Sequence, residues 1–121
     1  MTDHEKLLVA SICPAIQARN LIKFWYDNST GSQYSDWHIV EPYILGVFNN
    51  GSIQLSAWVL PTPEQAERGR KEAWRSYILK NISKLEVLGQ FQTARPDFDP
   101  KATGMREIFC AGKRDAFMRI A

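Results

Sequence analysis

Residues 37–60 have the sequence WHIVEPYILGVFNNGSIQLSAWVL, and this stretch decides the fold. It contains one charged residue, Glu41, and it is interrupted once, by Asn49, Asn50 and Gly51. An Asn-Gly pair between two apolar segments is typical of a two-residue type I′ turn, because both residue types tolerate the positive φ angles that the turn needs. We therefore predict a β-hairpin that turns at Asn50-Gly51.

The predicted turn determines which side chains share each face of the hairpin. One face is apolar throughout and is expected to be buried; it carries Ile44, Gly46 and Phe48 opposite Ala57, Leu55 and Ile53. The opposite face is half polar and partly aromatic; it carries Tyr43, Leu45, Val47, Gln54, Ser56 and Trp58. A two-stranded ribbon is only marginally stable alone, so the flanking segments must supply further strands.

The flanking segments predict one helix and several more strands. Apolar spacing indicates a short helix from about Cys13 to Arg19, with Pro14 in its first turn. Aromatic and β-branched residues indicate strands at Leu21–Tyr26, Trp74–Leu79, Leu85–Phe91 and Met105–Ala111. The proline-containing segments 61–73 and 93–104 are expected to be loops. The predicted fold is mainly β within the α+β class: a small, strongly bent antiparallel sheet or barrel after a short N-terminal helix.

The composition is that of one globular domain spanning residues 1–121. Hydrophobic residues make up 45% and charged residues 23%, and no apolar segment approaches the ~20 residues of a membrane helix. The net charge of +2 is too small to indicate nucleic-acid binding by itself. Basic residues nevertheless cluster between positions 68 and 84, where only Glu72 is acidic: Arg68, Arg70, Lys71, Arg75, Lys80 and Lys84.

Cys13 and Cys110 lie far apart in the chain and have no partner at a recognisable spacing. We predict that both are free, buried thiols in a reducing cytoplasm. The two histidines, His4 and His38, have no cysteine or carboxylate at ligand spacing, so neither a metal site nor a cofactor is expected.

Arg75 is the leading candidate for a ligand contact, because it follows Trp74 in an otherwise apolar segment. An arginine beside aromatic residues on a sheet offers a phosphate contact and a stacking plane, as in proteins that bind single-stranded nucleic acids. The alternative is that Arg75 only extends along the sheet edge. Further basic, aromatic or polar candidates are Lys23, His38, Tyr43, Gln54, Trp58 and Lys80. For these residues the alternative is a covered sheet face or a solvated charge.

The order of these segments resembles the WYL domain, an SH3-like or Sm-like bent sheet found mostly in bacterial transcription regulators. The resemblance covers about residues 13–90, which leaves 91–121 as a C-terminal extension. Its motifs are a strand ending in Tyr26, Val40-Glu41-Pro42 before the hairpin, Gly51 to Leu55 after the turn, and Arg75 to Ile82. The chain departs from the family at Ile53-Gln54, where the family has Trp-Tyr, and at Asn81, where it has Arg. The N-terminal helix-turn-helix that is usual in the family is expected to be absent.

The resemblance implies a non-catalytic module of transcription regulation that senses a nucleotide or single-stranded nucleic acid in a basic, aromatic-lined groove. No nucleophile–base pair, phosphate-binding loop or paired-carboxylate arrangement is evident, so we do not expect an enzyme. The alternative is an SH3-like protein–protein interaction or dimerisation domain that uses Trp25, Tyr43 and Trp58. Its partner would be a second copy or a separately encoded regulator, and no membrane is involved.

Overall fold

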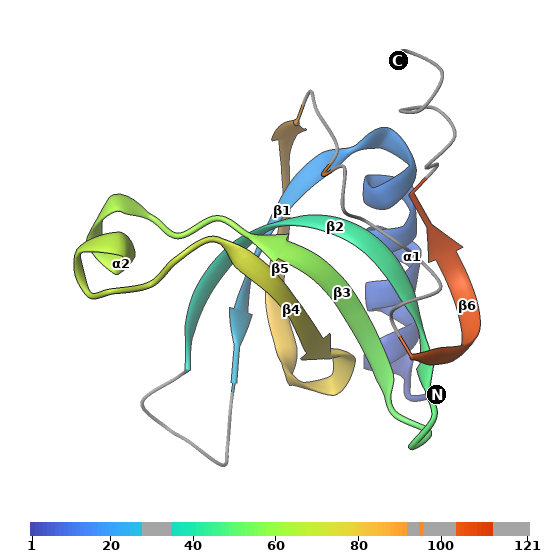
Figure 1. Ribbon diagram of the computed structural model, residues 1–121. Coiled ribbons are helices and arrows are strands. Elements are labelled where there is room, and N and C mark those ends of the chain that lie inside the picture. Colours follow the sequence, from blue (N-terminus) through green and yellow to red (C-terminus); the bar gives the residue numbers. More distant parts are fainter. Residues whose placement is uncertain (28–34, 92–94, 96–103, 113–121) are drawn as a thin grey trace.

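The computed structural model describes residues 1–27, 35–91, 95 and 104–112 (Figure 1). The predicted loop at 93–104 lies mostly outside these residues. Two helices, one 3-10 turn and six strands follow one another in this order: α1 (Asp3–Ala18), β1 (Asn20–Tyr26), β2 (Asp36–Phe48), β3 (Ile53–Val59), α2 (Pro63–Glu67), β4 (Ala73–Ile78), η2 (Leu79–Asn81), β5 (Ile82–Gln90) and β6 (Met105–Ala111). The prediction of a mainly antiparallel β fold with an N-terminal helix is confirmed, and within the described residues the sheet is not closed.

Strand β2 is the centre of the sheet. Strand β3 pairs with it along one edge, whereas the other edge is shared: β1 pairs with residues 36–40 and β6 pairs with residues 44–48. Strand β4 then adds to β3 and β5 adds to β1, so the order is β4-β3-β2-β1-β5. Figure 1 shows how strongly β2 and β3 bend, with α1 packed against them and β6 beside α1.

Helix α1 is longer than predicted and begins ten residues before Cys13. Thr2 and Glu5 form a reciprocal capping box, in which each side chain accepts a hydrogen bond from the other residue's backbone N–H. Pro14 lies inside the helix rather than in its first turn, where it has no N–H to donate to the carbonyl of Ala10; both residues are exposed. No described helix is long and apolar enough to cross a membrane.

The hairpin turns where the sequence predicts, but its loop has three residues instead of two. The N–H of Phe48 donates to the carbonyl of Ser52, and the N–H of Gly51 donates to the carbonyl of Phe48, both at 2.9 Å. Within this loop only Gly51 has a positive φ angle, +87°, while the side chain of Asn50 accepts hydrogen bonds from Ser52. An asparagine that bonds the backbone two residues ahead forms a turn without adopting positive φ itself.

The longer loop shifts the strand register by one residue. Leu45 therefore lies opposite Leu55, and Gly46 lies opposite Gln54. The prediction that Ile44, Phe48, Ile53 and Leu55 are buried together is wrong, because Ile44 lies on the face opposite Leu55. A one-residue shift moves every side chain to the other face of a strand.

The two faces of the sheet have separate clusters of buried side chains. Between α1 and the sheet lies the main core: Leu8, Ile12, Ala15, Ile16, Ile22, Phe24, Val40, Leu45, Leu55, Ala57, Val59, Tyr77, Leu79 and Ile82. A second cluster on the other face contains Tyr43 and Ile44 with Trp58, Trp74, Phe91, Met105 and Ala111. A bulge between Pro42 and Ile44 changes the alternation within β2, which is why both Val40 and Leu45 reach the main core.

Cys13 and Cys110 form a disulfide between α1 and β6, so the prediction of free thiols is wrong. The helix extends through Cys13, and β6 pairs with β2 so that Cys110 lies opposite Leu45. These two elements bring the Cα atoms within 5.7 Å of each other. The cysteines are 97 residues apart in sequence, and a contact at that range leaves no spacing signal.

Strand β6 approaches β2 closely at Gly46. A Cβ atom at this position would overlap the backbone oxygen of Glu107 and lie 2.9 Å from the sulfur of Met105. Glycine permits this approach because it has no side chain.

Gly51→Val is expected to lower the free energy of unfolding by about 1 kcal/mol or more, because a β-branched residue resists the positive φ angle of this position. Denaturant unfolding of both proteins measures the difference. The matched control is Asn49→Val, in the same exposed loop at a residue without positive φ. Equal stability of Gly51→Val and the wild type would contradict the turn geometry.

Candidate ligand-binding site

A basic cleft with a volume of about 500 Å³ lies beside the segment that joins α2 to β4. Its lining contains four basic side chains and a single carboxylate, and the residues are Asp36, Arg68, Gly69, Arg70, Lys71, Ala73 and Arg75. Three elements therefore meet there: the start of β2, the loop after α2, and β4. The excess of positive charge makes the cleft a candidate site for an anion.

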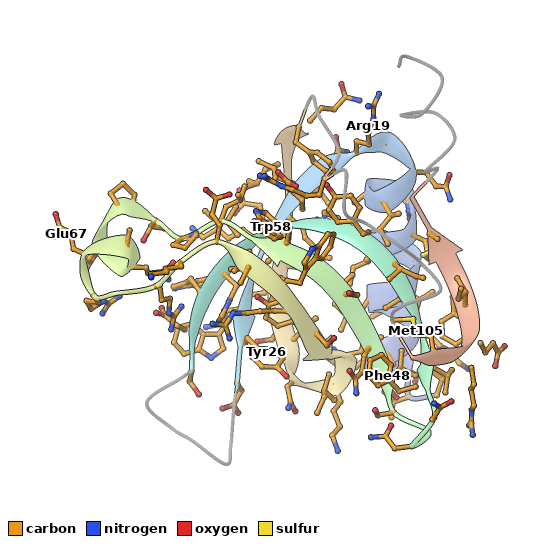
Figure 2. The ribbon with its side chains drawn as sticks, in the orientation of Figure 1. Arg19, Tyr26, Phe48, Trp58, Glu67 and Met105 are labelled. Carbon is orange, nitrogen blue, oxygen red and sulfur yellow. A yellow bond between two sulfur atoms is a disulfide. The ribbon has the colours of Figure 1, made fainter. Side chains whose placement is uncertain are left out.

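Helix α2 positions the loop that carries most of these basic residues. Thr62 and Gln65 form a capping box at its start, with Pro63 as its first residue, and Gly69 follows its end at φ +93°. The buried Gln65 side chain donates to the carbonyl of Trp37 at 2.9 Å and to Asp36 Oδ2 at 3.3 Å. These bonds tie α2 to the start of β2, although the segment around Glu67 projects from the sheet (Figure 2).

Asp36 is the carboxylate of the cleft. Its Oδ2 lies 3.7 Å from Nη2 of Arg68 and 3.5 Å from Nη2 of Arg70, while Oδ1 accepts a hydrogen bond from the N–H of Trp37 at 2.7 Å. Burial alone would raise the pKa of Asp36. Hydrogen bonds from Trp37 and Gln65 and the charges of the two arginines outweigh burial, so the pKa lies below its ordinary value and Asp36 is ionised.

Two buried nitrogen atoms near the cleft, His38 Nε2 and Arg70 Nη1, have no hydrogen-bond partner among the described residues. The His38 side chain is 6% exposed and its Nδ1 lies 3.1 Å from the hydroxyl of Tyr77. Burial lowers the pKa of His38 to about 4, and the positive charges of Arg70 and Arg75 contribute to the same shift. The ring is therefore neutral at pH 7. Unpaired buried polar atoms are uncommon and call for an explanation, such as a ligand.

Arg75 lies in the cleft lining, opposite Ala57 on the neighbouring strand. It is exposed, and its side chain makes no hydrogen bond or ion pair with any residue that the structure describes. Its charge acts on His38, so the structure brings together two candidates that the sequence treated separately.

Tyr43 and Trp58, by contrast, belong to the second cluster and do not line the cleft (Figure 2 labels Trp58). Tyr43 is 1% exposed, its hydroxyl donates to Glu41 at 2.9 Å and accepts from the N–H of Arg95 at 2.8 Å, and burial raises its pKa. The guanidinium of Arg95 lies 4.6 Å from the centre of the Trp58 ring. Neither aromatic ring is thus presented as an open stacking surface.

The remaining candidates also lie outside the cleft lining. The buried Gln54 side chain donates to Oγ of Ser52 at 2.8 Å, which is a local contact at the hairpin end. Lys80 is exposed in η2. The ammonium of Lys23 lies 5.0 Å from the centre of the Trp37 ring.

Asp36 and Arg95 were not candidates in the sequence analysis, and Arg68 and Arg70 were noted there only as part of a basic cluster. One signal was present: Thr62-Pro63-Glu64-Gln65 is a helix-start pattern, which predicts a structured loop rather than a free one. The ion pairs of Asp36 join positions more than thirty residues apart, and Arg95 lies 54 residues from Glu41. Sequence spacing contains no information about such contacts.

Comparison with known proteins supports the fold. No family model matches the chain, and no curated protein matches it in sequence. A solved structure of proteasome accessory factor B/C (PafBC) of Arthrobacter aurescens is similar, with a TM-score of 0.56 and 23% sequence identity. The match covers 83% of this chain and 14% of that chain. At this level of identity, the likeness shows that the two chains share a fold over the matched region.

Proposed function

We propose that this chain is a non-catalytic regulatory module that binds a phosphate-bearing ligand, a nucleotide or single-stranded nucleic acid, in the basic cleft. The observation that carries the proposal is the composition of that cleft, with four positive charges against one negative charge. The regulatory part of the proposal comes from the resemblance of the sequence motifs to the WYL domain, and the similarity to PafBC supports the fold.

The side chains of the cleft suit phosphate chemically. A guanidinium binds a phosphate through two parallel N–H bonds, and such charge-assisted bonds are roughly twice as strong as neutral ones. Arg75 is available for this contact, and Arg70 has a buried nitrogen atom without a partner among the described residues. The volume of about 500 Å³ falls within the range of small-molecule sites, which is roughly 300–1,000 Å³.

The cleft accounts for the phosphate but not for the base of a nucleotide. Tyr43 is buried and Arg95 covers part of the Trp58 ring, so the aromatic lining expected from the family resemblance is not formed by these two residues. The same observations weaken the alternative of peptide docking, since it relied on both rings. We propose that recognition rests on charge, with a separately encoded regulator or a second copy of the chain receiving the signal.

Arg75→Lys is expected to weaken binding of a labelled oligothymidylate about tenfold, because lysine cannot form the paired N–H contacts of a guanidinium. Fluorescence polarisation at two salt concentrations measures the effect, with nucleoside monophosphates as unlabelled competitors. Removal of one phosphate-binding side chain, for example in Arg70→Ala, should lower the slope of log affinity against log salt by about one unit.

The matched control is Arg106→Lys, an identical change at an exposed residue of β6 outside the cleft lining. It should bind as the wild type does. Wild-type affinity no better than the non-specific level of roughly 10⁻⁴ M would rule out the ligand-binding proposal. Undiminished binding by Arg75→Lys would remove Arg75 from the site.

A further inference from the structure

We propose that Asp36 is an internal competitor of the ligand: its carboxylate occupies the anion position of the cleft and leaves Arg68 and Arg70 when a phosphate group binds. The inference rests on the proposed function and adds a regulatory element to the same site. Asp36 thereby sets a threshold, so that a weakly charged ligand does not fill the cleft.

The contacts of Asp36 with the two arginines are loose. Distances of 3.5 and 3.7 Å exceed the roughly 2.7–2.9 Å of a close charge-assisted hydrogen bond. The Arg68 side chain is 62% exposed, and an ion pair with such a partner contributes little stability. Loss of these two ion pairs when a ligand binds therefore costs little stability.

Arg70 gains from the exchange. Its side chain is 25% exposed, its Nη2 faces Asp36, and its Nη1 is buried without a partner among the described residues. A carboxylate at 3.5 Å from one nitrogen does not satisfy a guanidinium, which has five N–H donors. A phosphate has more acceptor oxygens than a carboxylate, so it can accept from Nη2 of Arg70 and also contact Arg75 in the same lining.

The backbone of Asp36 stays in place during the exchange. Asp36 is the first residue of β2 and pairs with Tyr26 on β1, so only its side chain has to rotate. The rotation breaks the contact of Oδ2 with Gln65, which is the buried residue that ties α2 to β2. Ligand binding thereby removes the longer of the two hydrogen bonds by which Gln65 holds α2 to β2, and the bond to the carbonyl of Trp37 remains.

The test is the affinity of Asp36→Asn for a labelled oligothymidylate, with inorganic pyrophosphate as competitor. Asparagine keeps the acceptor for the N–H of Trp37 but removes the negative charge. We expect binding to become about fivefold tighter or more for both probes, because the variant has one repulsive charge fewer next to the phosphate. The matched control is Glu86→Gln, which changes the net charge equally at an exposed position of β5 and should have no such effect.

The outcomes separate this inference from the proposed function. If neither the wild type nor Asp36→Asn binds either probe, the proposed function fails. If the wild type binds and Asp36→Asn binds equally or more weakly, the inference is overturned while the proposed function stands, and Asp36 then only positions the arginines. Should Asp36→Asn fail to fold, judged by its thermal unfolding, Asp36→Ser provides the same charge removal with a hydroxyl acceptor. Equal tightening in Glu86→Gln would also overturn the inference.

Discussion

Removal of the Cys13–Cys110 disulfide is expected to lower the free energy of unfolding by roughly 4 kcal/mol. The bridge joins positions 97 residues apart, so it restricts most of the unfolded chain and removes much of its conformational entropy. It also fixes β6 to α1, and β6 pairs only with β2 among the described strands. Denaturant unfolding with and without a reducing agent measures the effect, and non-reducing mass analysis should show a mass lower by two hydrogens.

The double variant Cys13→Ser/Cys110→Ser is the control, because it should match the reduced wild type in stability and show no response to the reducing agent. A wild type that unfolds at the same denaturant concentration in both conditions, with two free thiols by mass, would contradict the bridge. In that case, any difference in stability between the double variant and the wild type would come from changes in packing alone.

Acidification from pH 7.5 to pH 5 is expected to lower the free energy of unfolding by about 2 kcal/mol through His38. The pKa of His38 is about 4 in the fold, against an ordinary value of 6.5. Between these pH values the unfolded chain binds a proton at His38 that the folded chain does not bind. The contribution of the neutral ring to the free energy of unfolding is therefore fully present above pH 6.5 and decreases as the pH falls toward 4. The full decrease, reached below pH 4, is about 3 kcal/mol.

His38→Phe should remove this pH dependence, because phenylalanine does not titrate. Its ring can pack on Phe24 as the His38 ring does, at a centroid distance of 6.0 Å and an interplanar angle of 12°. His4→Gln serves as the control at the other histidine of the chain and should keep the dependence. Titration of the His38 ring by NMR provides a direct check. A midpoint near pH 6.5 would show that the ring is not held neutral by its surroundings.

The sequence predicts the strands better than it predicts their register. The strand Met105–Ala111 has the predicted bounds, and the strands around Trp74 and Leu85 differ from the prediction by a few residues. The register of the hairpin depends on the turn type, and the turn type depends on the hydrogen bonds that the side chain of Asn50 accepts from Ser52. Local contacts of this kind compete with the backbone preference from which the turn was predicted.

The candidate site could be predicted only in part. Arg75 lines the cleft, whereas His38 is buried outside the lining but close enough for the charge of Arg75 to affect its pKa. For Tyr43 the sequence left open whether its face is open or covered; the residue lies at the bulge of β2 and is covered on the second face. A bulge interrupts the two-residue period on which any assignment of strand faces depends. The contacts of Asp36 form because α2 and the loop after it lie beside the start of β2, and the sequence does not predict that arrangement.

The glycine at position 46 has a consequence beyond its own strand. Strand β6 can lie on β2 only where residue 46 has no side chain. A side chain at position 46 would force β6 away from this part of β2, and Cys110 lies on β6. The glycine is therefore a condition for the Cys13–Cys110 bridge as well as for the strand pairing.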